Sequence, residues 1–319
     1  MLNHDDEVLS RLKVYEAPPD GFDPHSASDK LLRKHGFPRR PDPEKEPQLS
    51  KLWRDAFSRP VKVIKPQLAV DRVMSQRRPL LNMNAPEKNT LNKHAQSKKS
   101  DFGPSGWGGV IVQTSSLGYN PFEPANVVYA QLVVPTMESF PNELNQPLTV
   151  GFWVGLGGAF GSQELLQAGI AATVNGNNTS YWAWFEWYTT QYQDPAVAIT
   201  NFPISPGDLI TVLVCTPQPD HGFVSMLNVK TNVTTSVGVP ARPGITSDGT
   251  TAEWIVEGVS PQLPDFVDVV FVNITAGTQH HSFDLTDGTL TSISGTNGNL
   301  TTASIMSPKA AGVIWDGSN

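Results

Sequence analysis

Hydrophobic and polar residues alternate along the last two thirds of the chain, and this alternation predicts β-strands. From Trp107 onward, short segments rich in Val, Ile, Thr and aromatic residues follow one another, and turn-forming runs such as NGNN, SPGD and SDGTT separate them. No stretch in this part keeps helical periodicity for more than a turn or two. We therefore expect an all-β domain, either an antiparallel sandwich or a closed barrel, because every strand edge must be paired or covered.

The first hundred residues follow a different pattern. Amphipathic stretches at 7–13 and 47–57 favour short helices, but proline clusters interrupt them. Such a segment buries little apolar surface, so we expect it to be mostly irregular, with one or two short helices. We predict that residues 1–104 form a basic, propeptide-like or disordered segment and linker, and that residues 105–319 form the β-sandwich domain.

Charge divides the chain at the same place. Residues 1–100 contain 20 Lys and Arg against 13 Asp and Glu, whereas residues 101–319 contain 3 against 17. The segment of net charge +7 thus has an electrostatic partner of net charge −14 within its own chain. We expect it to dock there as an intramolecular inhibitor, and we do not expect the protein to bind nucleic acid.

Several function classes lack their sequence signals. No apolar run is long enough for a membrane-spanning helix, and the first twenty residues are too charged for a signal peptide. The single cysteine, Cys215, cannot form a disulfide within the chain or a multi-cysteine zinc site. HExxH, P-loop and GxSxG motifs are missing. We expect a monomer that needs no cofactor, no metal and no membrane.

Polar side chains occur on three of the predicted strands, among aromatic and small residues. Strand alternation places them on defined faces, and a buried carboxylate or amide needs a hydrogen-bonding partner. We expect these faces to line a cleft, although for each strand alone a rim satisfied by water is an alternative. The residues are Gln167 of LLQAG, Trp184, Glu186 and Tyr188 of YWAWFEWY, and Glu253 and Glu257 of AEWIVE.

The order of these motifs resembles a known family. A tryptophan and two glycines at 107–109 are followed by FWVGLGG, LLQAG, YWAWFEWY and AEWIVE. Over residues 107–276 this order and spacing are similar to those of the glutamic peptidases, or eqolisins. The resemblance implies a concanavalin A-like jelly-roll sandwich of two antiparallel sheets, which agrees with the strand pattern.

The resemblance also implies an activity, an acid-acting endopeptidase that hydrolyses polypeptides with an activated water, and an extracellular location. Gln167 matches the catalytic glutamine of the family and Glu257 its catalytic glutamate. The resemblance implies that Gln167 donates a hydrogen bond to the developing oxyanion, and that Glu257 acts first as general base and then as general acid. The remaining matches belong to the substrate-binding cleft: Trp153, Trp184, Glu186 and Tyr188.

Three positions depart from the family pattern. The family usually has acidic residues where this chain has Gly157, Ala171 and Ser260. Their replacement leaves two alternatives open. One is a non-catalytic concanavalin-like domain whose aromatic cleft binds carbohydrate or peptide. The other is a glycoside hydrolase with Glu186 and Glu257 as its carboxyl pair.

Overall fold

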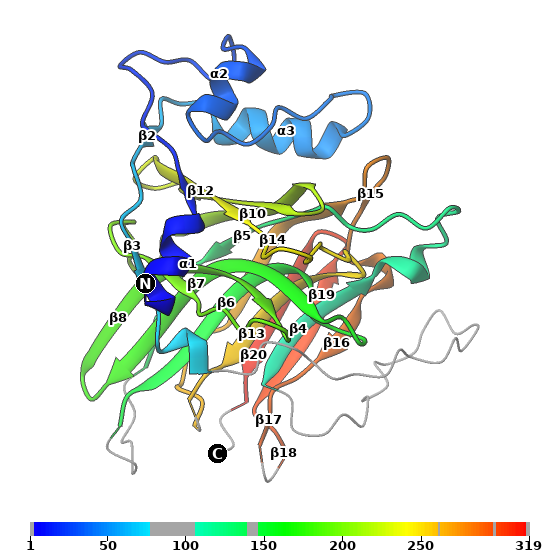
Figure 1. The fold of residues 1–319 in the computed structure, drawn as a ribbon. Helices are drawn as coiled ribbons and strands as arrows, with labels where there is room; N and C mark the ends of the chain where they lie inside the picture. The colour runs from blue at the N-terminus through cyan, green and yellow to red at the C-terminus, as the bar shows by residue number, and fades with distance from the viewer. Residues whose placement is uncertain (1–2, 77–105, 139–145, 261, 296–297, 317–319) are drawn as a thin grey trace.

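The structure, a computed structural model, describes residues 3–76, 106–138, 146–260, 262–295 and 298–316. The described residues form mainly strands, with short helices concentrated at the N-terminal end (Figure 1). The helices are α1 (His4–Arg11), α2 (Asp29–Lys34), α3 (Pro47–Ala56), η1 (Met74–Gln76), η2 (Thr114–Leu117) and η3 (Leu285–Asp287). The strands before the first long hairpin are β1 (Lys13–Val14), β2 (Lys62–Val63), β3 (Leu68–Val70), β4 (Trp107–Gln113) and β5 (Val127–Val133).

The long strands follow in the middle of the chain. They are β6 (Leu148–Gly157), β7 (Glu164–Asn175), β8 (Asn178–Thr189), β9 (Val197–Ile199), β10 (Leu209–Gln218), β11 (His221–Asn228), β12 (Val233–Pro240), β13 (Thr251–Gly258) and β14 (Val269–Gly277). The last strands are β15 (Ser282–Phe283), β16 (Thr289–Thr291), β17 (Ser294–Gly295), β18 (Gly298–Asn299), β19 (Thr301–Ser307) and β20 (Ala310–Trp315).

Two large sheets pack face to face. One has the order β1-β12-β11-β10-β5-β14-β20-β19, with β2 and β15 attached, and the other has the order β16-β4-β13-β6-β7-β8-β9-β3. Their pairings are antiparallel except for the short parallel pair of β2 with β12. The predicted sandwich of antiparallel sheets is therefore confirmed.

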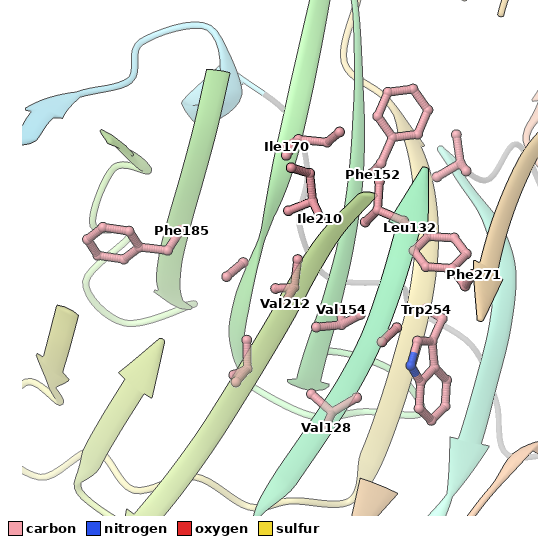
Figure 2. Packing of buried hydrophobic residues seen from close by; sticks show 14 of the residues in the cluster. Val128, Leu132, Phe152, Val154, Ile170, Phe185, Ile210, Val212, Trp254 and Phe271 are labelled. Carbon is pink, nitrogen blue, oxygen red and sulfur yellow. The ribbon is translucent and has the colours of Figure 1, made fainter. Parts of the chain in front are cut away.

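The main core lies between the two sheets (Figure 2). Phe152 and Val154 of β6 and Trp254 of β13 come from the eight-stranded sheet, and Leu132 of β5 and Phe271 of β14 come from the ten-stranded sheet. All five are buried, and the three from β6 and β13 are even-numbered. The odd-numbered residues of these strands therefore point away from this core, as strand alternation requires.

The N-terminal segment is more ordered than its proline-rich sequence predicts. Helices form near both predicted stretches, and α2 is a third that the pattern did not indicate. Asn3 caps α1 by accepting a 2.8 Å hydrogen bond from the Asp6 N–H, and acidic residues occupy the first turn of that helix. Among the described residues, no helix is long and apolar enough to cross a membrane.

This segment packs on both sheets of the sandwich. Strands β1 and β2 pair with β12, and β3 pairs with β9 at the edge of the other sheet. Helices α2 and α3 lie outside the ten-stranded sheet (Figure 1), with Leu49 and Leu52 in an apolar cluster with Tyr129. The predicted boundary near residue 104 lies outside the described residues.

Candidate active site

The candidate site lies on the outer face of the eight-stranded sheet, opposite to the main core. Here the odd-numbered residues of β4, β6, β7 and β13 share a face with even-numbered residues of β8. A second apolar cluster covers this face and includes Trp107, Trp153, Trp184 and Ile255. The buried carboxylic acid and amide side chains that concern the candidate site lie among these residues: Gln167, Glu186, Glu253 and Glu257.

Gln167 and Glu257 lie on the same face, but they come from strands that are not neighbours. Strand β6 runs between β7, which carries Gln167, and β13, which carries Glu257. Gln167 is opposite Gly155 of β6, and Glu257 is opposite Gly151. Both β6 residues are glycines, and Trp153, which lies between them, is the β6 side chain next to Glu257. The two groups are therefore placed diagonally across β6, with Trp153 between their levels.

The Glu257 carboxylate is held by two indole rings. Trp107 Nε1 donates to its Oε1 and Trp153 Nε1 donates to its Oε2, each at 3.0 Å. The two rings meet edge to face, with centroids 4.8 Å apart, and the glutamate is 1% exposed. Hydrogen bonds to a charged acceptor are the strong ones, so this cradle stabilises a carboxylate away from bulk water.

Gln167 is oriented by Glu186 on the neighbouring strand. The two residues are register partners in β7 and β8, and Gln167 Nε2 donates to Glu186 Oε2 at 2.9 Å. Gln167 is fully buried, and its Oε1 has no hydrogen-bond partner among the described residues. An unsatisfied buried carbonyl is costly, so this oxygen is suited to accept a hydrogen bond from a small donor such as water.

The other predicted cleft residues of β8 lie on the same face. Trp184 is buried in the apolar cluster with Trp153. Tyr188 is half-buried, and burial together with the Glu186 charge raises the pKa of its hydroxyl. The structure thus brings all six predicted site residues onto one face of one sheet.

Glu253 is a third glutamate of this face, and it differs from Glu257 in its surroundings. It is directly level with Gln167, because both are opposite Gly155. Neither of its carboxylate oxygens has a hydrogen-bond partner among the described residues. Burial raises its pKa well above the ordinary value, and the charges of Asp248 and Glu164 raise it further.

An acidic pair continues from Glu253 toward the end of the sheet. Glu164 accepts from Trp187 Nε1 at 2.8 Å and from the Asp248 N–H at 2.9 Å. Burial, followed by the charge of Asp248, raises the pKa of Glu164 to about 8. Ser162 donates to Asp248 at 2.7 Å. Glu164 lies next to Gly157, one of the three positions at which this chain departs from the family pattern.

The geometry explains why Gly157 carries no side chain. Its φ is +84°, and a Cβ there would be 2.5 Å from the Glu164 carbonyl oxygen and 2.8 Å from Glu164 Oε1. Of the other two departures, Ala171 is buried opposite Gly151. Ser260 accepts a 2.9 Å hydrogen bond from the Thr149 N–H and fastens the end of β13 to β6.

Sequence reasoning missed two members of this face. The first is Trp107, whose indole donates to Glu257. Its place before two glycines in the sequence motif is the signal that could have indicated a role in the site. Met74, from the N-terminal segment, is fully buried in the same apolar cluster. No local pattern distinguishes it from any other methionine. Among the described residues, no group of three or more His, Cys, Asp or Glu side chains is placed to hold a metal ion.

Comparison with known proteins gives consistent results. Residues 105–315 match the Peptidase A4 family. Aspergillopepsin-2 of Aspergillus niger is 31% identical over 160 residues, which span 48% of this chain and 55% of that protein. The match thus covers about half the length of this curated relative.

Two solved structures share the fold. The structure of scytalido-glutamic peptidase with a transition state analog inhibitor has a TM-score of 0.55 and 22% identity, and covers 66% of this chain and 98% of its own. SCP-B, a member of the eqolisin family of peptidases in complex with the tripeptide Ala-Ile-His, has a TM-score of 0.51 at the same identity and coverage. These likenesses bear on the fold, and they agree with the sandwich described above.

Proposed function

Since this chain belongs to the Peptidase A4 family, we propose that it is an acid-acting glutamic endopeptidase whose water is activated between Gln167 and Glu257. The observation that carries this proposal is the Glu257 carboxylate held by two indole N–H groups, on the same sheet face as a buried glutamine. The substrate would be a polypeptide that binds over β6 on this face of the sheet.

Glu257 takes the role of general base and then of general acid. As a carboxylate it accepts a proton from the water, which attacks the scissile carbonyl carbon. It then returns this proton to the departing amine as the C–N bond breaks. The indole donors of Trp107 and Trp153 favour the charged form that the first step needs.

Gln167 stabilises the charge that develops on the substrate oxygen. One hydrogen of its amide NH2 is committed to Glu186, and this bond fixes the plane of the amide. The second hydrogen is available to the oxyanion of the tetrahedral intermediate. Its Oε1, which has no partner among the described residues, is suited to orient the attacking water.

The surroundings of the two glutamates of AEWIVE favour Glu257 over Glu253 as the base. Glu253 is level with Gln167, but it accepts no hydrogen bond from the described residues and its pKa is raised well above the ordinary value. It therefore remains a neutral acid over the acidic range in which we expect activity. A neutral carboxyl cannot accept the proton of water.

We also propose that the N-terminal segment inhibits the enzyme by docking on the domain. Arg11 of α1 and Arg242 of the domain both bind Asp194, and Arg242 also binds Glu7 of α1. These ion pairs connect the two oppositely charged parts of the chain. They support docking near neutral pH and its weakening when carboxylates become protonated.

The test is digestion of a denatured protein at about pH 2 to 5, in the presence of pepstatin and a chelator. We expect cleavage by the wild type, and a loss of about a hundred-fold or more in Glu257→Gln and Gln167→Ala. Glu253→Gln is the matched control, because it changes the other glutamate of the same strand and should retain activity. Cleavage that survives both site substitutions would contradict the assignment.

A further inference from the structure

A segment of the chain itself forms the edge of the sheet that carries the candidate site. Strand β3 pairs with β9 in register, with Leu68 opposite Ile199 and Val70 opposite Val197. The Asp71 N–H continues this ladder by donating to the Ala196 carbonyl at 2.8 Å. Residues 68–71 therefore extend the eight-stranded sheet as an added strand, which is one of the ways in which proteins bind extended peptides.

Beyond β3 the segment turns onto the outer face of the eight-stranded sheet, which carries the candidate site. Asp71 Oδ2 accepts from Trp182 Nε1 at 2.5 Å, and Asp71 Oδ1 accepts from the N–H groups of Val73 and Met74 at 3.0 Å. The Ala196 N–H donates to the Ser75 hydroxyl at 3.0 Å. These contacts fix the turn of η1 and direct the side chain of Met74 into the apolar cluster.

Met74 fills a pocket whose floor is a glycine. Its Cε is 2.8 Å from the point that a Cβ on Gly151 would occupy, and the rings of Trp153 and Trp184 each come within 3.7 Å of the same point. Gly151 is in turn the register partner of Glu257. The Met74 pocket, formed by Gly151, Trp153 and Trp184, is thus next to the proposed catalytic carboxylate.

We propose that the Met74 pocket is a substrate subsite for a long, unbranched apolar side chain, and that Met74 occupies it in the full chain. The inference rests on the proposed peptidase function. Because the terminal methyl of Met74 reaches the floor, a shorter β-branched side chain such as valine leaves the bottom of the pocket unfilled. An aspartate would place a second carboxylate beside Glu257 in an apolar site, so this position selects against acidic residues.

The floor glycine provides the first test. The peptides of the test set differ at one position and are digested at the acidic pH at which we expect the N-terminal segment to be displaced. The wild type should cleave those with methionine or norleucine at that position at least about ten-fold better than those with valine or aspartate. Gly151→Ala should reduce this preference to about two-fold or less. Gly312→Ala of β20 is the matched control, because the atoms nearest its new Cβ belong to flexible side chains. An unchanged preference in Gly151→Ala would overturn the inference.

The second test does not need activity. In the full chain carrying Glu257→Gln, we compare Met74→Asp with Met306→Asp, since Met306 is 63% exposed. Met74→Asp should raise amide hydrogen exchange in residues 68–76 by about ten-fold or more, and Met306→Asp should not. The Met74→Asp chain should also bind the nonapeptide LAVDRVMSQ at least ten-fold more tightly than the same peptide with aspartate at the methionine.

The outcomes separate the two proposals. Equal binding of the two nonapeptides, or unchanged exchange in Met74→Asp, would overturn the subsite. Selective binding of the methionine peptide in this test, together with no cleavage of any peptide by the wild type at any pH, would support the subsite and contradict the peptidase function.

Discussion

Trp153 Nε1 lies 3.0 Å from Glu257 Oε2, on adjacent strands of the same sheet, and Trp107 binds the other oxygen of the carboxylate from the opposite side. Each indole supplies one donor and an apolar ring. The pair thus excludes water from the carboxylate and stabilises its charge at the same time. This arrangement makes the donors of the two rings separately testable.

Trp153→Phe should lower kcat/KM by about 10- to 100-fold, because one hydrogen bond to a charged group contributes about 1.5–3 kcal/mol. The phenyl ring keeps most of the packing, so the variant should still fold. Steady-state kinetics at acidic pH are the measurement. Trp254→Phe is the control, because its indole donates to the Tyr129 carbonyl in the main core. An equal loss of kcat/KM in both variants would mean that the effect is one of general packing.

Glu186 should act as a positioning residue for Gln167. In Glu186→Leu the amide of Gln167 loses its acceptor, and we expect kcat to fall about ten-fold while KM changes little. Glu186→Gln keeps an acceptor oxygen at the same place and should restore most of kcat. A comparison of kcat with KM for the two variants decides the role, since a substrate-binding residue would raise KM instead.

Glu253 should make the protein less stable as the pH rises. A carboxyl whose pKa is raised in the folded state keeps its proton while the unfolded chain loses it, so stability declines above the ordinary pKa of 4.5. Glu253→Gln removes this loss. The melting temperature of the variant should exceed that of the wild type at pH 8 and equal it near pH 4. Glu44 is exposed, and Glu44→Gln should have the melting temperature of the wild type at both pH values. A melting temperature of Glu253→Gln that differs from that of the wild type by the same amount at pH 4 and pH 8 would contradict the prediction.

The ion pairs of Asp194 should hold α1 on the domain until the solution is strongly acidic. Burial alone would raise the pKa of Asp194, but the hydrogen bonds and charges of Arg242 and Arg11 outweigh it, and the pKa is lowered from 3.8. The charged Asp194 therefore stabilises docking above about pH 3.8, and this stabilisation is lost as the pH falls through the lowered pKa of Asp194.

Asp194→Asn should release α1 already near neutral pH. Hydrogen exchange in residues 4–11 should rise in the variant at pH 7 and in the wild type only below about pH 4. Asp220→Asn changes an exposed acid that pairs with His221 and should leave this exchange unchanged. Slow exchange in α1 of Asp194→Asn at pH 7 would show that packing, and not the ion pairs, holds the helix.

The sequence alone determined the class of fold and the face on which each site residue lies. Period-two alternation in AEWIVE separates Glu257 from Trp254, and the structure confirms this division, because a side chain's face depends only on its position within its own strand. The resemblance to glutamic peptidases is likewise confirmed by the family match over residues 105–315.

Only the tertiary structure decided which polar groups meet. Trp107 binds a glutamate 150 residues away, Gln167 and Glu257 are separated by β6, and Met74 reaches the floor at Gly151 from the N-terminal segment. Register and strand order depend on contacts between distant parts of the chain, and no local pattern records them. The same holds for burial, which leaves Glu253 without a hydrogen-bonding partner among the described residues while Glu257, four residues along the same strand, receives two.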